Sequence, residues 1–197
     1  MTDIKKIKPL PEIKNKADVH FVFQIAIATS DMEGLLENWK NLFNIDEANI
    51  IKRCTKDLFD IGEFDGANYY GKPCQFFIKY CRFDLGNMDI EIIEPLDKNP
   101  GNPYSDFLIR NGGKSGIQHI AVRVDDRDGF KKTMDELDVI PLQKAILGKP
   151  DKDGFVKDCY FYDLLDYLGV ILEIGSVVVG PMAKDPKAGN PVAYKDR

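Results

Sequence analysis

The chain has 197 residues, 44% of them hydrophobic, and its 27 Lys and Arg against 32 Asp and Glu give a formal net charge of -5. This is the size and composition of a globular protein with one substantial core or two modules that share one. The acidic balance offers no basic footprint for nucleic acid, no apolar run approaches the roughly 20 residues of a membrane span, and the amino terminus lacks a signal-peptide core. We therefore expect a cytoplasmic protein with no nucleic-acid and no membrane partner.

Two segments of the chain repeat each other without a gap. QIAIATSDMEGLLENWKNLFNI, residues 24–45, aligns with HIAVRVDDRDGFKKTMDELDVI, residues 119–140, at a constant offset of 95. The identical pairs are Ile25/Ile120, Ala26/Ala121, Asp31/Asp126, Gly34/Gly129, Leu42/Leu137 and Ile45/Ile140. Such a repeat predicts two copies of one structural unit.

Each copy begins with a strand that leads into a helix. Along residues 21–28 bulky side chains alternate with small ones, which puts Phe23 on the face that the helix covers and Gln24 on the opposite face. Asp31 and Asp126 take the position of a helix N-cap, and apolar residues follow each of them at helical spacing. Each helix is therefore expected to cover the bulky face of its own sheet.

Further strand-like runs follow each helix and end in MDIEIIEP, residues 88–95, and GVILEIGSV, residues 169–177. The pattern predicts an α+β fold of two βαβββ modules. We expect an N-terminal arm at 1–19, the first module at 20–97, a connector with a short helix at 98–115, the second module at 116–179 and a C-terminal tail at 180–197. Residues 57–71 and 148–155 are interpreted as loops, and the Gly- and aromatic-rich stretch 62–73 as a lid or an inert surface loop.

Four polar residues take matching places in the two modules: Gln24 matches His119, and Glu91 matches Glu173. All four alternate with apolar neighbours, so they point away from the faces that the helices cover. Taken singly, such residues are most often exposed or hydrogen-bonded within a core. Together, oxygen and imidazole donors from two related modules suit a divalent ion such as Zn, Ni, Co, Mn or Fe(II). We expect one such ion per site.

Three stretches carry a resemblance to a known family: FDLGNMDIEIIEPL (83–96), GIQHIAVRVDD (116–126) and YDLLDYLGVILEIGS (162–176). From about Phe21 to Ser176 the chain resembles the vicinal oxygen chelate superfamily, which includes glyoxalase I, methylmalonyl-CoA epimerase, extradiol dioxygenases and bleomycin-resistance proteins. It looks most like methylmalonyl-CoA epimerase. The resemblance implies one metal ligand from the first and one from the last strand of each module, and these places fall on Gln24, Glu91, His119 and Glu173.

The ligand order departs from the epimerase pattern. Gln, Glu, His, Glu resembles the zinc set of eukaryotic glyoxalase I, whereas epimerases more often show His, Gln, His, Glu. The glyoxalase arginine expected four residues after the first ligand is Ala28 here, and the asparagine expected four after the second is Pro95. These two differences argue against a glutathione substrate.

The implied activity is that of a metal-dependent isomerase or lyase, epimerase-like or glyoxalase I-like, that transfers a proton at a carbon next to a carbonyl. In this hypothesis His119 anchors the metal and Gln24 completes its coordination sphere. Glu173 leaves or loosens from the metal to take the carbon-bound proton, and Glu91 serves the opposite face of the substrate.

Arg123 follows His119 by four residues on the same strand face and is the candidate for binding a carboxylate or phosphate of the small-molecule substrate. The alternative for Arg123 is a surface salt bridge to Asp125 or Asp126. We also expect a homodimer, because two-module chains of this family generally pair further.

Two other functions stay open. A ring-cleaving dioxygenase needs two His and one carboxylate around Fe(II), but His20 lies four residues before Gln24, roughly 13 Å along a strand at about 3.3 Å per residue. A non-catalytic binding or resistance protein would use the same cavity to sequester a small molecule. Such proteins generally lack the full ligand set.

Overall fold

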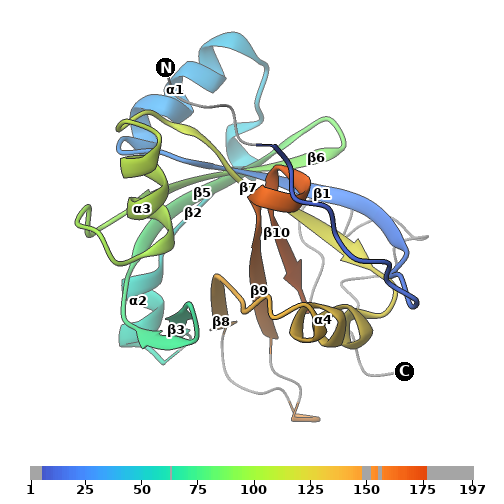
Figure 1. The fold of residues 1–197 in the computed structure, drawn as a ribbon. Coiled ribbons are helices and arrows are strands. Elements are labelled where there is room, and N and C mark those ends of the chain that lie inside the picture. Colours follow the sequence, from blue (N-terminus) through green and yellow to red (C-terminus); the bar gives the residue numbers. More distant parts are fainter. Residues whose placement is uncertain (1–5, 63, 148–151, 155–156, 177–197) are drawn as a thin grey trace.

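The computed structural model describes residues 6–62, 64–147, 152–154 and 157–176 (Figure 1). Its strands are β1 Val19–Ala28, β2 Ile51–Cys54, β3 Phe64–Tyr69, β4 Lys72–Cys74, β5 Ile78–Leu85, β6 Met88–Pro95, β7 Gly116–Val124, β8 Gln143–Leu147, β9 Lys157–Leu164 and β10 Val170–Gly175. Its helices are α1 Met32–Leu42, a 3-10 turn Glu47–Asn49, α2 Thr55–Asp60, α3 Pro103–Arg110, α4 Arg127–Glu136 and α5 Leu165–Leu168. The predicted tail, residues 180–197, and much of the predicted loop 148–155 lie outside the described residues.

The ten strands form one mixed sheet in the order β2-β5-β6-β1-β7-β10-β9-β8-β3-β4. The modules meet where β1 and β7 pair antiparallel, and the last strand of each module, β6 or β10, pairs parallel with its first. The register repeats as well, because Glu91 stands opposite Ala26 as Glu173 stands opposite Ala121. The predicted α+β fold of two βαβββ modules is confirmed.

Helices α1 and α4 each cover the outer face of their own module (Figure 1). Leu36 of α1 packs with Phe83 and Ile92, and Met134 of α4 packs with Tyr162. Burying a side chain of this kind contributes about 1.5–3 kcal/mol, so these contacts fix which face of the sheet is closed. The opposite face is left for the site.

Both helices begin with the same cap. Asp31 Oδ1 accepts a hydrogen bond from the Gly34 backbone N–H at 3.0 Å, and Asp126 Oδ1 accepts one from Gly129 N–H at 2.8 Å. A Cβ on either glycine would overlap Oδ2 of the capping aspartate. The Asp and Gly that recur in the sequence repeat therefore act as a pair, in which the glycine leaves room for the cap.

This pairing predicts a non-additive effect on stability. Asp31→Ala should lower the free energy of unfolding by about 1 kcal/mol. A Gly→Ala substitution within a helix usually raises the free energy of unfolding by about 1 kcal/mol. Gly34→Ala should give no such gain, because the new methyl group displaces the capping carboxylate. In the Asp31→Ala background the same substitution should recover that gain. Urea unfolding of the two single variants and the double variant measures the coupling, and an equal effect of Gly34→Ala in both backgrounds would contradict it.

The segment interpreted as a lid or an inert loop belongs to the sheet. Residues 57–71 include the end of α2 and strand β3, which forms a hairpin with β4. β3 also pairs antiparallel with β8 of the second module, where Asn68 stands opposite Lys144. The loop interpretation is therefore wrong. The strand was missed because this stretch has few β-branched residues, and because its pairing partner lies far along the chain.

The strict alternation predicted along β1 also fails, at Phe23. The pairing of β1 with β7 shifts register between Val22 and Gln24. Phe23 and Gln24 are both buried, and both line the same cavity. An irregularity of this kind breaks the two-residue period and re-aims a side chain, so Phe23 does not lie on the helix-covered face.

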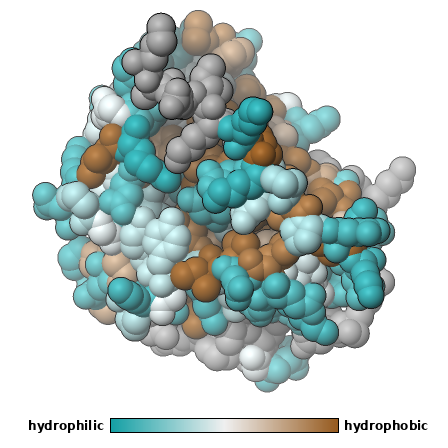
Figure 2. All heavy atoms as spheres, in the orientation of Figure 1, coloured by the Kyte–Doolittle hydropathy of each residue, from teal (hydrophilic) through white to brown (hydrophobic). Residues whose placement is uncertain are grey.

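Exposed large apolar side chains are distributed over many elements of the described surface, among hydrophilic ones (Figure 2). Leu42 on α1, Ile61 after α2 and Ile117 on β7 are examples. Single exposed apolar residues are ordinary in folded proteins and do not define an interface, so the homodimer stays a prediction. None of the helices in the described ranges has the length and apolar character that a bilayer crossing requires.

Candidate functional site

A cavity of about 150 Å³ lies between the two modules, on the face of the sheet away from α1 and α4. It is lined by Phe23, Gln24, Thr55, Leu58, Phe76, Ile78, Tyr80, Arg82, Glu91, Tyr104, Gln143, Ala145, Lys157, Asp158, Cys159, Phe161, Glu173 and Gly175. Three of the four predicted ligands are in this lining. The fourth, His119, is fully buried beside it, with its ring edge-on to Phe161 at a centroid distance of 4.8 Å.

Two rows of residues across neighbouring strands bring the predicted ligands together. The rows are Glu91–Ala26–His119 on β6, β1 and β7, and Gln24–Ala121–Glu173 on β1, β7 and β10. Neighbouring strands lie about 4.8 Å apart, so long side chains at the two ends of a row can meet above the small residue between them. Both alanines are fully buried. They are the same pair that the sequence repeat shares, and each stands between two of the predicted ligands.

His119 is oriented by its neighbours on both sides of the ring. Nδ1 contacts Oε1 of Gln118, which can only accept a hydrogen bond, so the proton of a neutral ring belongs on Nδ1. Nε2 then carries the lone pair, and it lies 3.0 Å from Oε2 of Glu173. Among the described residues Nε2 has no hydrogen-bond partner. A nitrogen lone pair and a carboxylate that face each other are stabilised by a shared cation.

Glu91 is the most perturbed of the candidate carboxyl groups. Burial raises its pKa to about 8; the positive charge of Arg82 opposes the shift, and the negative charge of Glu173 adds to it. Two carboxylates thus face one small cavity. At neutral pH the raised pKa favours the protonated form of Glu91.

The raised pKa of Glu91 predicts how stability depends on pH. Between about pH 4.5 and pH 8 the folded chain keeps a proton that the unfolded chain releases, so the free energy of unfolding should fall as pH rises through this window. Glu91→Gln should remove that fall. Urea unfolding of metal-free protein at several pH values measures it, with the exposed Glu12→Gln as control. Equal pH dependence in the parent and Glu91→Gln would show that Glu91 is not the group responsible.

Arg82 and Asp89 join the site without having been predicted. Asp89 Oδ2 accepts hydrogen bonds from Gln24 Nε2 at 2.6 Å and from Arg82 Nε at 2.9 Å, and Arg82 Nη2 lies 2.8 Å from the same oxygen. Because Asp89 engages the amide nitrogen of Gln24, it leaves the amide oxygen free to act as a ligand. Asp89 shares the face of Glu91 on β6, two residues away. Arg82 lies seven residues before Asp89, across the short turn that joins β5 and β6, so the hairpin was a local signal that could have found this pair.

The connector also contributes to the cavity, through Tyr104 of α3. Burial raises the pKa of the Tyr104 hydroxyl far above its usual value, and a hydrogen bond from Gln143 opposes the shift. Burial likewise keeps the Cys159 thiol protonated by raising its pKa well above the usual range. Both groups are therefore neutral, and Tyr104 can donate a proton in a hydrogen bond to an oxygen in the cavity.

The predicted donor atoms are of the kinds that bind divalent ions, but the structure does not bring them together into a metal site. In the ranges that the structure describes, no three His, Cys, Asp or Glu side chains are grouped closely enough to hold a metal ion. Nε2 of His119 has no hydrogen-bond partner among the described residues and lies 3.0 Å from the Glu173 carboxylate, so the pair offers a place for positive charge. Ligation would require Glu91 and Gln24 to turn toward His119.

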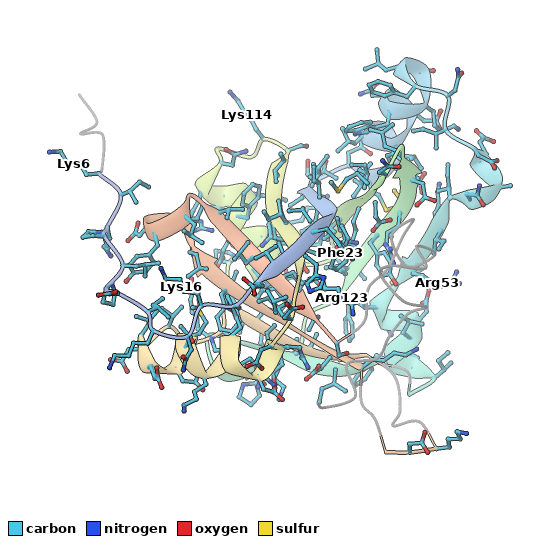
Figure 3. All side chains as sticks on the ribbon, turned by 90° about the vertical axis from the view of Figure 1, so that its right-hand side faces the viewer. Lys6, Lys16, Phe23, Arg53, Lys114 and Arg123 are labelled. Carbon is cyan, nitrogen blue, oxygen red and sulfur yellow. The ribbon has the colours of Figure 1, made fainter. Side chains whose placement is uncertain are left out.

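Two other polar residues lie away from this cluster. His20, at the start of β1, is exposed and pairs with Asp125, so it does not supply a second histidine to the site. Arg123 lies on β7 opposite Phe21 of β1, and Figure 3 shows it together with Phe23. Arg123 is not among the described residues that line the cavity. A substrate contact by Arg123 stays a prediction.

Residues 23–156 match the family described as the glyoxalase/bleomycin resistance protein/dioxygenase superfamily. The chain belongs to this superfamily. The match includes Gln24, Glu91 and His119, whereas Glu173 lies beyond its end. Members of the superfamily differ in activity, so membership alone does not identify the reaction.

Solved structures support the glyoxalase superfamily fold. A variant of Streptomyces coelicolor methylmalonyl-CoA epimerase in complex with 2-nitronate-propionyl-CoA aligns with a TM-score of 0.50 at 15% identity, over 80% of this chain and 97% of that one. Methylmalonyl-CoA epimerase from Mycobacterium tuberculosis aligns with a TM-score of 0.50 at 17% identity, over 83% of this chain and 91% of that one. No curated protein sequence matches the chain. At these identities the likeness concerns the fold.

Proposed function

We propose that the protein is a metal-dependent enzyme that transfers a proton at a carbon next to a carbonyl, in the manner of methylmalonyl-CoA epimerase. The observation that carries the proposal is the pair of carboxylates, Glu91 and Glu173, which approach one cavity from opposite modules with the buried His119 beside Glu173. The likeness to epimerases that act on a CoA ester supports this chemistry. The missing glyoxalase arginine and asparagine make a glutathione adduct the less favoured substrate.

Each side chain has a separate task in the proposed reaction. His119, Gln24, Glu91 and Glu173 would hold a divalent ion, which supplies Lewis-acid stabilisation of the charge that gathers on a substrate oxygen. Glu173 removes the proton from carbon, and Glu91, on the other wall, can return one to the opposite face. Tyr104 donates a hydrogen bond from its neutral hydroxyl, and the apolar walls limit the entry of water.

A second candidate is a binding protein that sequesters a small molecule. The observation in its favour is that the four donors are not yet gathered into a metal site, while Phe23, Phe76 and Phe161 give the cavity largely apolar walls. Purified protein that holds no stoichiometric divalent ion, even after metal is added, would favour this second function.

Deuterium exchange tests the proposed reaction. Methylmalonyl-CoA is incubated with the protein and a divalent metal salt in deuterated water, and the proton on its α-carbon is followed by NMR. We expect this proton to exchange at a rate proportional to enzyme concentration and to stop exchanging after chelation. Absence of exchange with this ester and with related 2-substituted acids would favour the binding protein.

A further inference from the structure

The cavity has a cationic side as well as a side with carboxylates. Arg82 of β5 reaches the cavity wall, and its side chain is 16% exposed. The other cation in the lining, Lys157, is an exposed residue at the start of β9. Arg82 stands directly opposite Glu91 in the pairing of β5 with β6. The guanidinium and the proposed proton-transfer groups therefore share one small space.

Asp89 holds the guanidinium in place. This carboxylate is 2% exposed, and one of its oxygens contacts both Nε and Nη2 of Arg82. A guanidinium has five N–H donors in one plane, so Asp89 uses a part of the set and leaves the rest for another acceptor. Gln24 donates a hydrogen bond to the same carboxylate oxygen, so Asp89 itself is held from a second side.

The size and charge of the cavity limit what Arg82 can bind. A cavity of about 150 Å³ is smaller than the roughly 300–1,000 Å³ of typical ligand pockets, which suits the acyl end of a substrate and not a whole cofactor. An anionic group placed there would face Glu91 and Glu173 and be repelled unless a cation lay against it. An arginine held in one plane pairs with a carboxylate through two parallel hydrogen bonds.

We propose that Arg82, held by Asp89, is an anion subsite that selects substrates carrying a carboxylate beside the reacting carbon. This inference rests on the proposed function for its choice of substrate, and it assigns to Arg82 the recognition of the free carboxylate in malonate-type half-esters and half-thioesters. Neutral acyl groups of the same size would lose the contact with Arg82 and would be poor ligands.

The test compares malonate with malonamide, a neutral analogue of the same shape, by isothermal titration calorimetry on the purified full-length protein. Arg82→Met alone leaves Asp89 as an unpaired buried carboxylate, which is strongly destabilising. The variant is therefore Arg82→Met combined with Asp89→Asn, which keeps an oxygen acceptor for Gln24. Arg53→Met, on the exposed strand β2, is the matched control. Circular dichroism and metal content confirm that each variant is folded and loaded like the parent.

We expect malonate affinity to fall about 10- to 100-fold in the double variant, from the loss of charge-assisted hydrogen bonds, with malonamide affinity and the Arg53→Met control unchanged. Equal losses for malonate and malonamide, an unchanged malonate affinity, or no malonate binding to the parent would each overturn the subsite. Exchange of the α-proton of methylmalonyl-CoA separates the two proposals. The subsite predicts a raised KM with kcat changed only a few-fold in the double variant, whereas an inactive parent that still binds malonate through Arg82 would contradict only the proposed reaction.

Discussion

Replacing Glu173 with Gln is expected to lower the exchange of the substrate α-proton by about 100-fold or more. General base catalysis contributes roughly 10²- to 10⁴-fold, and the amide keeps the shape of the side chain and an oxygen donor while losing the base. Glu173 is the better candidate for this task because it lies 3.0 Å from a buried imidazole, which fixes its position, and it lines the cavity. NMR in deuterated water gives the rate directly.

A comparison of Glu173→Gln with Glu91→Gln assigns the roles of the two carboxyl groups in the reaction. If Glu91 is the second base, the loss should be comparable with that of Glu173→Gln; if it mainly serves as a ligand, the loss should be smaller and metal affinity should fall. Glu136→Gln, on the exposed face of α4, provides the control. Rapid exchange in both Glu91→Gln and Glu173→Gln would remove these carboxylates from the mechanism.

His119→Ala is expected to weaken binding of the divalent ion by more than about 100-fold. Removing a partner that only orients a metal-binding histidine typically costs 10- to 100-fold, so removing the imidazole itself should cost more. His119 is the nitrogen donor of the proposed set, and its Nε2 is buried, 3.0 Å from Glu173 Oε2 and without a hydrogen-bond partner among the described residues. Elemental analysis after dialysis, together with competition against a chromophoric chelator, measures stoichiometry and affinity.

The chain provides a matched control for this experiment, because it contains two histidines. His20 is exposed, pairs with Asp125 and lies outside the cavity, so His20→Ala should leave metal binding unchanged. Equal affinity of the parent and of His119→Ala for the ion would show that the imidazole is not a ligand. Loss of metal in both variants would point to a site elsewhere.

Local sequence patterns predicted the fold where structure depends on near neighbours. The two segments that repeat at an offset of 95 residues predicted the two modules. Asp31 and Asp126 marked the starts of α1 and α4, because a capping carboxylate accepts a hydrogen bond from the backbone N–H three residues later. Alternation along β6 likewise predicted that Glu91 faces away from α1. These features need no knowledge of distant contacts.

Most features that the sequence did not predict depend on distant contacts. β3 becomes a strand because β8, far along the chain, pairs with it. Phe23 enters the cavity through a register shift against β7. Tyr104 arrives from the connector, whose packing is set by elements far apart in the chain. Arg82 and Asp89 are the exception, because they are seven residues apart in the hairpin of β5 and β6, and the short turn between these strands was a local signal for their pairing.

The central claim is that four donors from two modules converge on one divalent ion. Crystals of metal-loaded protein, with diffraction recorded on both sides of the absorption edge of that metal, test it most directly. We predict one anomalous peak per chain, with His119 Nε2 and oxygens of Gln24, Glu91 and Glu173 as ligands at about 2.0–2.2 Å, as for zinc. A peak elsewhere, or a peak in the cavity that lacks His119, would contradict the account.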